Sequence, residues 1–286
     1  MKRNGLKYLL VFTFFLGIAL LLYPPVSDYI NSRNQSRVVQ QYQKTVGNMQ
    51  ERLKQQMIAD AKDYNKRLAE TPEAFFHPER VEGYAETLDI TGTGIMGYLD
   101  IDKIQLELPI YHDVSKEVLQ EAIGHLPGTS LPVGGIGTHT VLSGHRGLPS
   151  AKLFTDLDKL EPGDRFTITV LSEVFTYQVE RTKTVEPYQV DDLQLDPEQD
   201  LCTLFTCTPY GVNTQRLFVM AKRVPTDKIE ERRIFYTNEA YRITPAIVAP
   251  VIGLPVLLIV YLVMMFGGKK RSSQQETGGD DKPPQP

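Results

Sequence analysis

The sequence lacks the motifs that mark the common cofactor-dependent enzymes. It contains no Gly-rich phosphate loop, no dinucleotide-binding motif and no Cys/His spacing suited to zinc, so neither a cofactor nor a metal is expected. Cys-x-x-Cys is absent as well, which argues against thiol–disulfide exchange. There is no excess of basic residues, since the formal net charge is -4, and we expect no nucleic-acid partner.

Cysteine is scarce, and the two that are present are not spaced for a disulfide. Cys202 and Cys207 lie five positions apart on one predicted strand. At ~3.3 Å per residue, ~16 Å would separate their Cα atoms, whereas a disulfide needs roughly 4.4–6.8 Å. The odd spacing also directs the two side chains to opposite faces of a sheet. Both cysteines are therefore predicted to be free thiols.

Charged residues are almost missing from two segments. Residues 6–23 contain one, Lys7, and residues 246–266 contain none. Each segment approaches the roughly 20 residues of a membrane-spanning helix. Lysines and arginines at the outer ends of both segments place both termini in the cytoplasm. Because Tyr23-Pro24-Pro25 offers no small-residue cleavage site, we interpret the first segment as an anchor rather than a signal peptide. The sequence predicts a two-pass cell-membrane protein with an extracellular middle.

The extracellular part begins with a polar stretch that favours helix. Apolar residues recur there at steps of three and four, which predicts one helical stripe over residues 26–70. Its members are Tyr42, Val46, Met49, Leu53, Met57, Ala61, Tyr64 and Leu68. Pro72 ends the helix, since the residue before a proline resists the helical conformation. We expect the stripe to pack on the domain that follows; a coiled-coil dimer is the weaker alternative.

From residue 94 the pattern changes to short strands separated by Gly/Pro turns. Ser115 is expected to cap a helix over residues 115–123. Roughly seven or eight short strands favour a mostly β domain, a closed or nearly closed barrel. The predicted strands are 97–102, 103–109, 138–142, 165–171, 174–184, 200–206 and 215–224.

Cys207 has the setting of a nucleophile, because it ends an apolar strand just before a Pro/Gly loop. A thiol is only a few per cent ionised at pH 7, so it needs a base or a positive neighbour. His145 is the best of the five histidines, since it follows a strand and flanking glycines leave its ring bare. Arg216 heads the next strand, and a hairpin would bring it close to Cys207, where its charge could stabilise an oxyanion.

These residues lie in longer strings that resemble the class C, pilus-assembly sortases of Gram-positive bacteria. The strings are Gly94-Ile95-Met96-Gly97-Tyr98, Gly137-Thr138-His139-x-Val141-Leu142-Ser143-Gly144-His145-Arg146-Gly147-Leu148-Pro149 and Thr206-Cys207-Thr208-Pro209-Tyr210-Gly211-x-Asn213-Thr214-x-Arg216. The resemblance covers residues 91–224 and implies a sortase-type eight-stranded β-barrel, preceded by a helical segment and flanked by two transmembrane helices.

The resemblance also implies a cysteine transpeptidase. Cys207 would cleave an LPxTG-type signal between threonine and glycine and hold the pilin as a thioester. His145 would donate and accept the proton, Arg216 would stabilise the oxyanion, and Thr206 would help to place the substrate. A pilin lysine amine would resolve the thioester, so the partners are pilin or surface-protein substrates. No cofactor or metal is implied.

Two departures from the family pattern concern the surroundings of Cys207. Many pilus sortases carry an Asp-Pro-aromatic lid before the barrel, whereas this chain has Phe75, Phe76 and Pro78 with no aspartate before the proline. Our hypothesis is a loosely held lid that uses one of the phenylalanines. Gln215 stands where a histidine is expected.

The predicted order is an N-terminal tip and anchor, a helical segment, a lid or connector, the barrel, a linker, a second anchor and a disordered tail. These parts span residues 1–24, 25–72, 73–93, 94–225, 226–245, 246–267 and 268–286. Two alternatives remain open. One is a housekeeping sortase that attaches surface proteins to cell-wall peptide, and the other is a non-enzymatic membrane-tethered β-barrel.

Overall fold

The computed structural model describes residues 3–227 together with positions 253, 257–258 and 261. The chain divides into two units, Met1–Asn238 and Glu239–Pro286, and the first contains every strand of the described residues. Apart from those four positions, the predicted second anchor lies outside the described residues. So do the tail and most of the linker.

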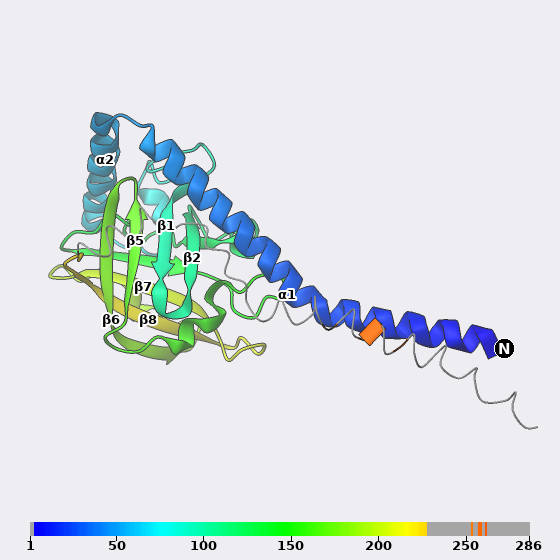
Figure 1. The fold of residues 1–286 in the computed structure, drawn as a ribbon. Coiled ribbons are helices and arrows are strands. Elements are labelled where there is room, and N and C mark those ends of the chain that lie inside the picture. The colour runs from blue at the N-terminus through cyan, green and yellow to red at the C-terminus, as the bar shows by residue number, and fades with distance from the viewer. Residues whose placement is uncertain (1–2, 228–252, 254–256, 259–260, 262–286) are drawn as a thin grey trace, which may run out of the picture. The chain divides into compact units, whose positions relative to one another are not determined.

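Two helices precede the barrel. They are α1 (Arg3–Gly47) and α2 (Glu51–Glu70). The predicted single helix over residues 26–70 is therefore wrong, because the chain turns at residues 48–50. Gly47 and Asn48 are weak helix formers. The break lets both helices pack on one barrel, as expected (Figure 1). Tyr42 of α1 and Tyr64 of α2 are buried in the same core, whereas Leu53, a predicted member of the stripe, is 50% exposed.

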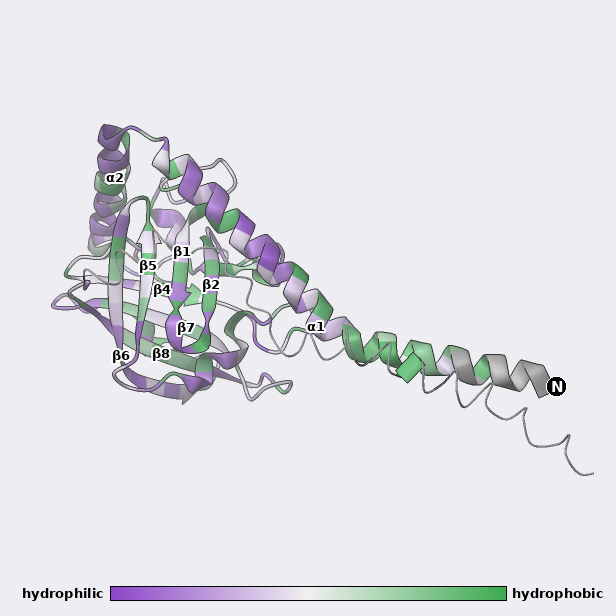
Figure 2. Cartoon of the chain, in the orientation of Figure 1, coloured by the Kyte–Doolittle hydropathy of each residue, from purple (hydrophilic) through white to green (hydrophobic). Residues whose placement is uncertain are grey.

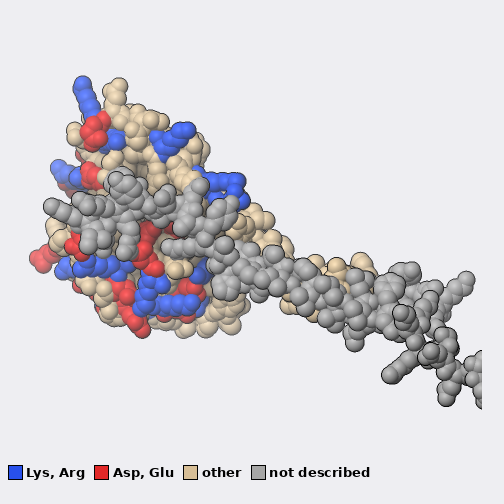
Figure 3. All heavy atoms as spheres, in the orientation of Figure 1, with Lys and Arg blue, Asp and Glu red and all other residues tan. Residues whose placement is uncertain are grey.

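The first half of α1 has the character of a membrane anchor. Large apolar side chains are exposed along it, among them Phe12, Leu20 and Leu21, and Figure 2 shows this part of α1 as predominantly apolar. Among the described residues, α1 is the one helix long and apolar enough to cross a membrane. This agrees with the predicted first anchor. The visible face of the barrel instead carries interspersed acidic and basic side chains (Figure 3).

Eight strands form a closed barrel, in line with the seven or eight strands predicted from the sequence pattern. The strand order is β1-β2-β3-β4-β7-β8-β6-β5. The β4–β7 and β2–β3 pairs are parallel, and the other pairs are antiparallel. The strands are β1 (Ile95–Ile101), β2 (Leu106–Tyr111), β3 (Ile123–His125), β4 (Thr138–Ser143), β5 (Arg165–Val170), β6 (Glu173–Val185), β7 (Asp200–Thr208) and β8 (Gln215–Val224).

The short strand β3 was missed because the predicted helix was too long at its C-terminal end. The helix is α3 (Lys116–Glu121), and the Ser115 side chain accepts a hydrogen bond from the Val118 N–H, as expected of its cap. Ala122 is already extended. The backbone then passes so close to Asp113 that any side chain at Gly124 would collide with the Asp113 carbonyl. A glycine is required there.

The apolar residues form two clusters on opposite faces of the strands. Leu142, Leu204 and Val219 belong to the core inside the barrel. Their neighbours in sequence point the other way and form what we call the outer-face cluster, over β4, β7, β8 and β6. Its buried members are Val141, Val185, Leu193, Phe218 and Met220, and Phe75, Leu126, Val190 and Phe205 pack against them.

The connector between α2 and the barrel is held by the fully buried side chain of His125. The His125 Nε2 donates to the carbonyl of Ser130 (2.8 Å), because a carbonyl only accepts. The Nδ1 then accepts from the hydroxyl of Tyr84 (2.9 Å), which also accepts from the N–H of Asp113 (3.1 Å). Burial lowers the pKa of His125 to about 4.

Acidification is expected to weaken the fold through His125. In the unfolded chain His125 has the usual histidine pKa of about 6.5. The free energy of unfolding that the buried neutral ring contributes is therefore fully present above that pH. It is lost as the pH falls through the folded value of about 4. The loss in the free energy of unfolding is about 3 kcal/mol. Urea unfolding of the detergent-solubilised chain between pH 7 and pH 4 measures it, and His125→Gln should show a flatter dependence. If the free energy of unfolding fell equally steeply with pH in the native protein and in His125→Gln, this role of His125 would be contradicted.

Candidate active site

The two cysteines lie on opposite faces of β7, and both are free thiols. Cys202 faces the barrel interior and is 0% exposed, and burial raises the pKa of its thiol. Cys207, near the end of the strand, is partly exposed. The two predictions from their odd spacing, no disulfide and opposite faces, are confirmed. Only Cys207 is placed to meet a molecule from outside.

Arg216 lies directly opposite Cys207 in the antiparallel register of β7 and β8. Opposite residues of such a pair share a face, with Cβ atoms roughly 4.5–5.5 Å apart. The guanidinium is steadied by the backbone, because its Nη1 donates to the carbonyls of Asn213 (3.3 Å) and Gln215 (3.1 Å). In the described part of the chain no carboxylate forms an ion pair with Arg216. Its charge is therefore available to a bound molecule.

His145 is brought to the same end of β7 by the parallel pairing of β4 and β7. Ser143, the last residue of β4, is the register partner of Phe205. The loop that follows stays tied to β7, since the Gly144 N–H donates to the carbonyl of Phe205 (3.2 Å) and the Thr206 hydroxyl donates to the carbonyl of Gly144 (2.7 Å). His145 thus leaves β4 beside the strand end that carries Cys207.

The electrostatic state of His145 suits proton transfer. Its side chain is partly buried, and burial lowers its pKa below the usual value. The ring is therefore neutral at pH 7 and able to accept a proton from a thiol. Thr206 is 1% exposed and its hydroxyl is used by Gly144, so any effect of Thr206 on a substrate passes through the loop that carries His145.

Of the predicted lid residues, Phe75 and Pro78 are partly buried and Phe76 is exposed. Phe75 packs on the outer-face cluster, the face of the sheet that carries Cys207 and Arg216. Phe76 is 59% exposed and lies edge-on to Phe75, with ring centroids 5.0 Å apart. Pro78 begins the short helix η1 (Pro78–Arg80). A side chain at Gly128 would come 2.7 Å from the carbonyl of Phe75, so this segment lies tightly against the barrel.

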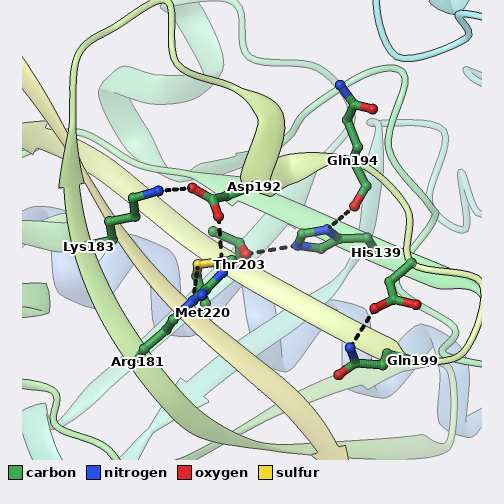
Figure 4. Close-up of polar contacts among 9 residues, drawn as sticks. His139, Arg181, Lys183, Asp192, Gln194, Gln199, Thr203 and Met220 are labelled. Atoms are coloured by element: carbon green, nitrogen blue, oxygen red, sulfur yellow. Dashed lines mark hydrogen bonds and ion pairs between the residues drawn. The ribbon is translucent and has the colours of Figure 1, made fainter.

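The same outer face continues into a cavity of about 540 Å³ beneath the β6–β7 loop. Figure 4 shows His139 between the loop and β7: its Nδ1 donates to the Gln194 carbonyl (2.9 Å), and its Nε2 accepts from the Thr203 hydroxyl (2.8 Å). Asp192 of the loop pairs with Arg181 and Lys183 of β6. Thr203 lies ~13 Å from Cys207 along β7. The sequence did not predict that His139 links the β6–β7 loop to β7, because its two hydrogen-bond partners are distant in the chain.

One end of the closed barrel therefore carries a cysteine, a neutral histidine and an arginine, beside a long apolar face. The arginine has no ion-pair partner among the described residues. This arrangement defines a candidate enzyme with a cysteine nucleophile. The family model of the sortase domain matches residues 99–224. The chain belongs to the sortase family, whose members are cysteine transpeptidases.

Solved structures of class C sortases match more of the chain than the sortase-domain model does. Sortase C1 from Streptococcus agalactiae is 47% identical, with a TM-score of 0.62 over 67% of this chain and 100% of that chain. Sortase C from Streptococcus pneumoniae is 39% identical, with a TM-score of 0.61 over 66% of this chain and 97% of that one. These matches place the chain in class C.

Curated relatives match over a shorter length. Sortase D of Bacillus subtilis is 31% identical over 131 residues, 45% of this chain and 63% of that protein. Sortase A of Streptococcus agalactiae is 28% identical over 131 residues, 45% of this chain and 52% of that protein. The chain thus spans less than two thirds of the length of either curated relative.

Proposed function

We propose that this protein is a membrane-anchored transpeptidase that joins pilin subunits. The observation that carries the proposal is the register of β7 and β8, which sets Cys207 opposite the available charge of Arg216. The parallel β4–β7 pair brings His145 to the same strand end. Nucleophile, base and oxyanion donor then come from three different elements of one rigid barrel, which suits positioning of a reacting carbonyl.

The chemistry follows from these three groups. Neutral His145 takes the thiol proton as Cys207 Sγ attacks the threonine carbonyl of an LPxTG-type signal. Arg216 donates to the oxyanion. The C–N bond to glycine breaks, and His145 returns the proton to the leaving amine, so the donor remains as a thioester. A lysine amine then attacks the thioester and loses a proton to His145. The C–S bond breaks, and the thiol is restored.

The acceptor separates the pilus class from the housekeeping alternative. The class C neighbours favour a pilin lysine as the acceptor amine. One of them, sortase C from Streptococcus pneumoniae, is described in terms of its pilin substrate specificity. The full chain in detergent should be incubated with an LPxTG-type pilin and, separately, with a cell-wall peptide amine. We expect lysine-linked pilin multimers. Products with the cell-wall peptide alone would support the housekeeping function, and no cleavage at all would support the non-enzymatic barrel.

We also propose that the connector covers the nucleophile, with Phe75 as the residue that holds it closed. Phe75→Ala is expected to speed labelling of Cys207 by a neutral maleimide several-fold, because the cover loses its apolar contact with the outer-face cluster. Cys202 is fully buried and does not contribute to the signal. Phe76→Ala is the matched control and should label at the native rate, since Phe76 is exposed. Equal labelling of native protein and a chain without residues 71–84 would exclude a lid.

The membrane arrangement completes the proposal. The apolar first half of α1 would anchor the chain and present the barrel outside the cell, with both termini in the cytoplasm. The second anchor rests on the sequence pattern of residues 246–266.

A further inference from the structure

Arg146 follows His145 in sequence and joins the two sides of the candidate active site. Its Nη1 donates to the hydroxyl of Thr208 (3.1 Å), the residue that follows Cys207. Its Nη2 pairs with the carboxylate of Asp158 (2.5 Å) in the short helix η3 (Leu153–Lys159). The residues next to the histidine and next to the cysteine are therefore linked by one guanidinium.

Stability alone does not account for an arginine at this position. The Arg146 side chain is 9% exposed, and its Nε is buried without a hydrogen-bond partner among the described residues. Burying a charge with one carboxylate and an unsatisfied N–H brings little or no net stabilisation compared with an apolar side chain of similar size. The position therefore bears an energetic cost, which is typical of a functional site.

The surroundings hold the loop of Arg146 from two further directions. The N–H of Gly147 donates to the Thr155 hydroxyl of η3 (3.1 Å). Gly147 has a φ of +77°, and a side chain there would come 3.0 Å from the ring of Tyr210 in the β7–β8 loop. The loop after β4 is thus wedged between η3 and the β7–β8 loop. The Arg146 side chain links the loop after β4 to η3 and to Thr208, the last residue of β7.

We propose that Arg146 is a positioning residue that sets the separation of His145 and Cys207; this role rests on the proposed function of the same site. The planar fork of an arginine reaches Thr208 and Asp158 at the same time, whereas a lysine can reach only one of them. Without the link, the Gly144 contacts still hold the start of the loop to β7, but the part of the loop after His145 loses its tie to Thr208. Small misplacements of this kind slow proton transfer more than they weaken binding.

Steady-state cleavage of an LPxTG-type donor by the full chain tests the proposal. Arg146→Met is expected to lower kcat by roughly 10²-fold with KM within about threefold. Arg146→Lys should recover part of the loss, and Arg165→Met, a β5 arginine paired with Asp227, should leave kcat unchanged. Thr208→Val should add little to Arg146→Met, because both variants break the same link. A rise in KM alone, or fully additive effects, would overturn the proposal.

A second readout does not depend on the substrate. When the rate of Cys207 alkylation by iodoacetamide is plotted against pH, it should show a step that depends on His145 and is absent in His145→Gln. In Arg146→Met the same step should be smaller or absent. A step that persists at full size in Arg146→Met, with a native thermal unfolding midpoint, would refute positioning by Arg146. Absence of donor cleavage by the native chain would instead refute the proposed transpeptidase function, so the two failures are distinguishable.

Discussion

Replacing Cys207 by alanine is expected to reduce LPxTG-donor cleavage to background, a loss of roughly 10⁴-fold or more. The reason is that Cys207, which stands opposite Arg216 in the β7–β8 register, is the proposed nucleophile. Cleavage is measured by release of the glycine-containing fragment from a labelled donor peptide. Among the described residues, Cys202 is the one other cysteine, and it points into the barrel core.

Cys202→Ala is the matched control for this prediction. It removes a thiol from the same strand but leaves the candidate site intact, so kcat should stay near the native value. The small cavity it creates should lower the free energy of unfolding by about 1 kcal/mol. If Cys202→Ala were fully folded but inactive while Cys207→Ala stayed active, the assignment of the nucleophile would be reversed.

The second large effect is expected at Arg216. Arg216→Gln should lower kcat by roughly 10²–10³-fold, as removal of one oxyanion donor does in other enzymes that transfer acyl groups. Because the carbonyl gains charge only in the transition state, the loss should fall on kcat rather than on KM. Arg216→Lys keeps the charge but not the fork of donors, and it should be intermediate.

Lys222→Gln provides the comparison on the same strand. Lys222 is exposed on β8, six positions beyond Arg216, and its loss should not change turnover. A KM increase with native kcat in Arg216→Gln would show that Arg216 binds the donor without stabilising the oxyanion. That result would leave the nucleophile assignment intact but remove the proposed role of the charge.

The barrel and the meeting of Cys207 with Arg216 could be predicted because both depend on local rules. Period-two alternation identifies strands that bury one face, and a short loop between two strands makes a hairpin whose ends are neighbours. His145 was proposed for a similar reason, since glycines around a residue just after a strand are expected to leave its ring accessible. In each case the informative residues lie within a few positions of one another.

Features that depend on distant contacts were not predicted. The break between α1 and α2 follows the weak helix formers Gly47 and Asn48, yet the spacing of the apolar residues shows no interruption there. The parallel pairing of β4 with β7 brings His145 to the end of β7 that carries Cys207, yet it joins segments that are distant in the chain. The links from Arg146 to Thr208 and from His139 to Gln194 are also non-local. Hydrophobic periodicity carries no signal for such polar contacts.

The most direct test of the central claim is the mass of the acyl-enzyme. The full chain should be incubated with an LPxTG-type donor without an amine acceptor, quenched in acid and digested. We predict that the donor, cut after threonine, is attached through a thioester to the peptide that contains Cys207, and that Cys207→Ala carries no adduct. A donor fragment bound to any other residue, or an adduct that persists in Cys207→Ala, would contradict the assignment of Cys207 as the nucleophile.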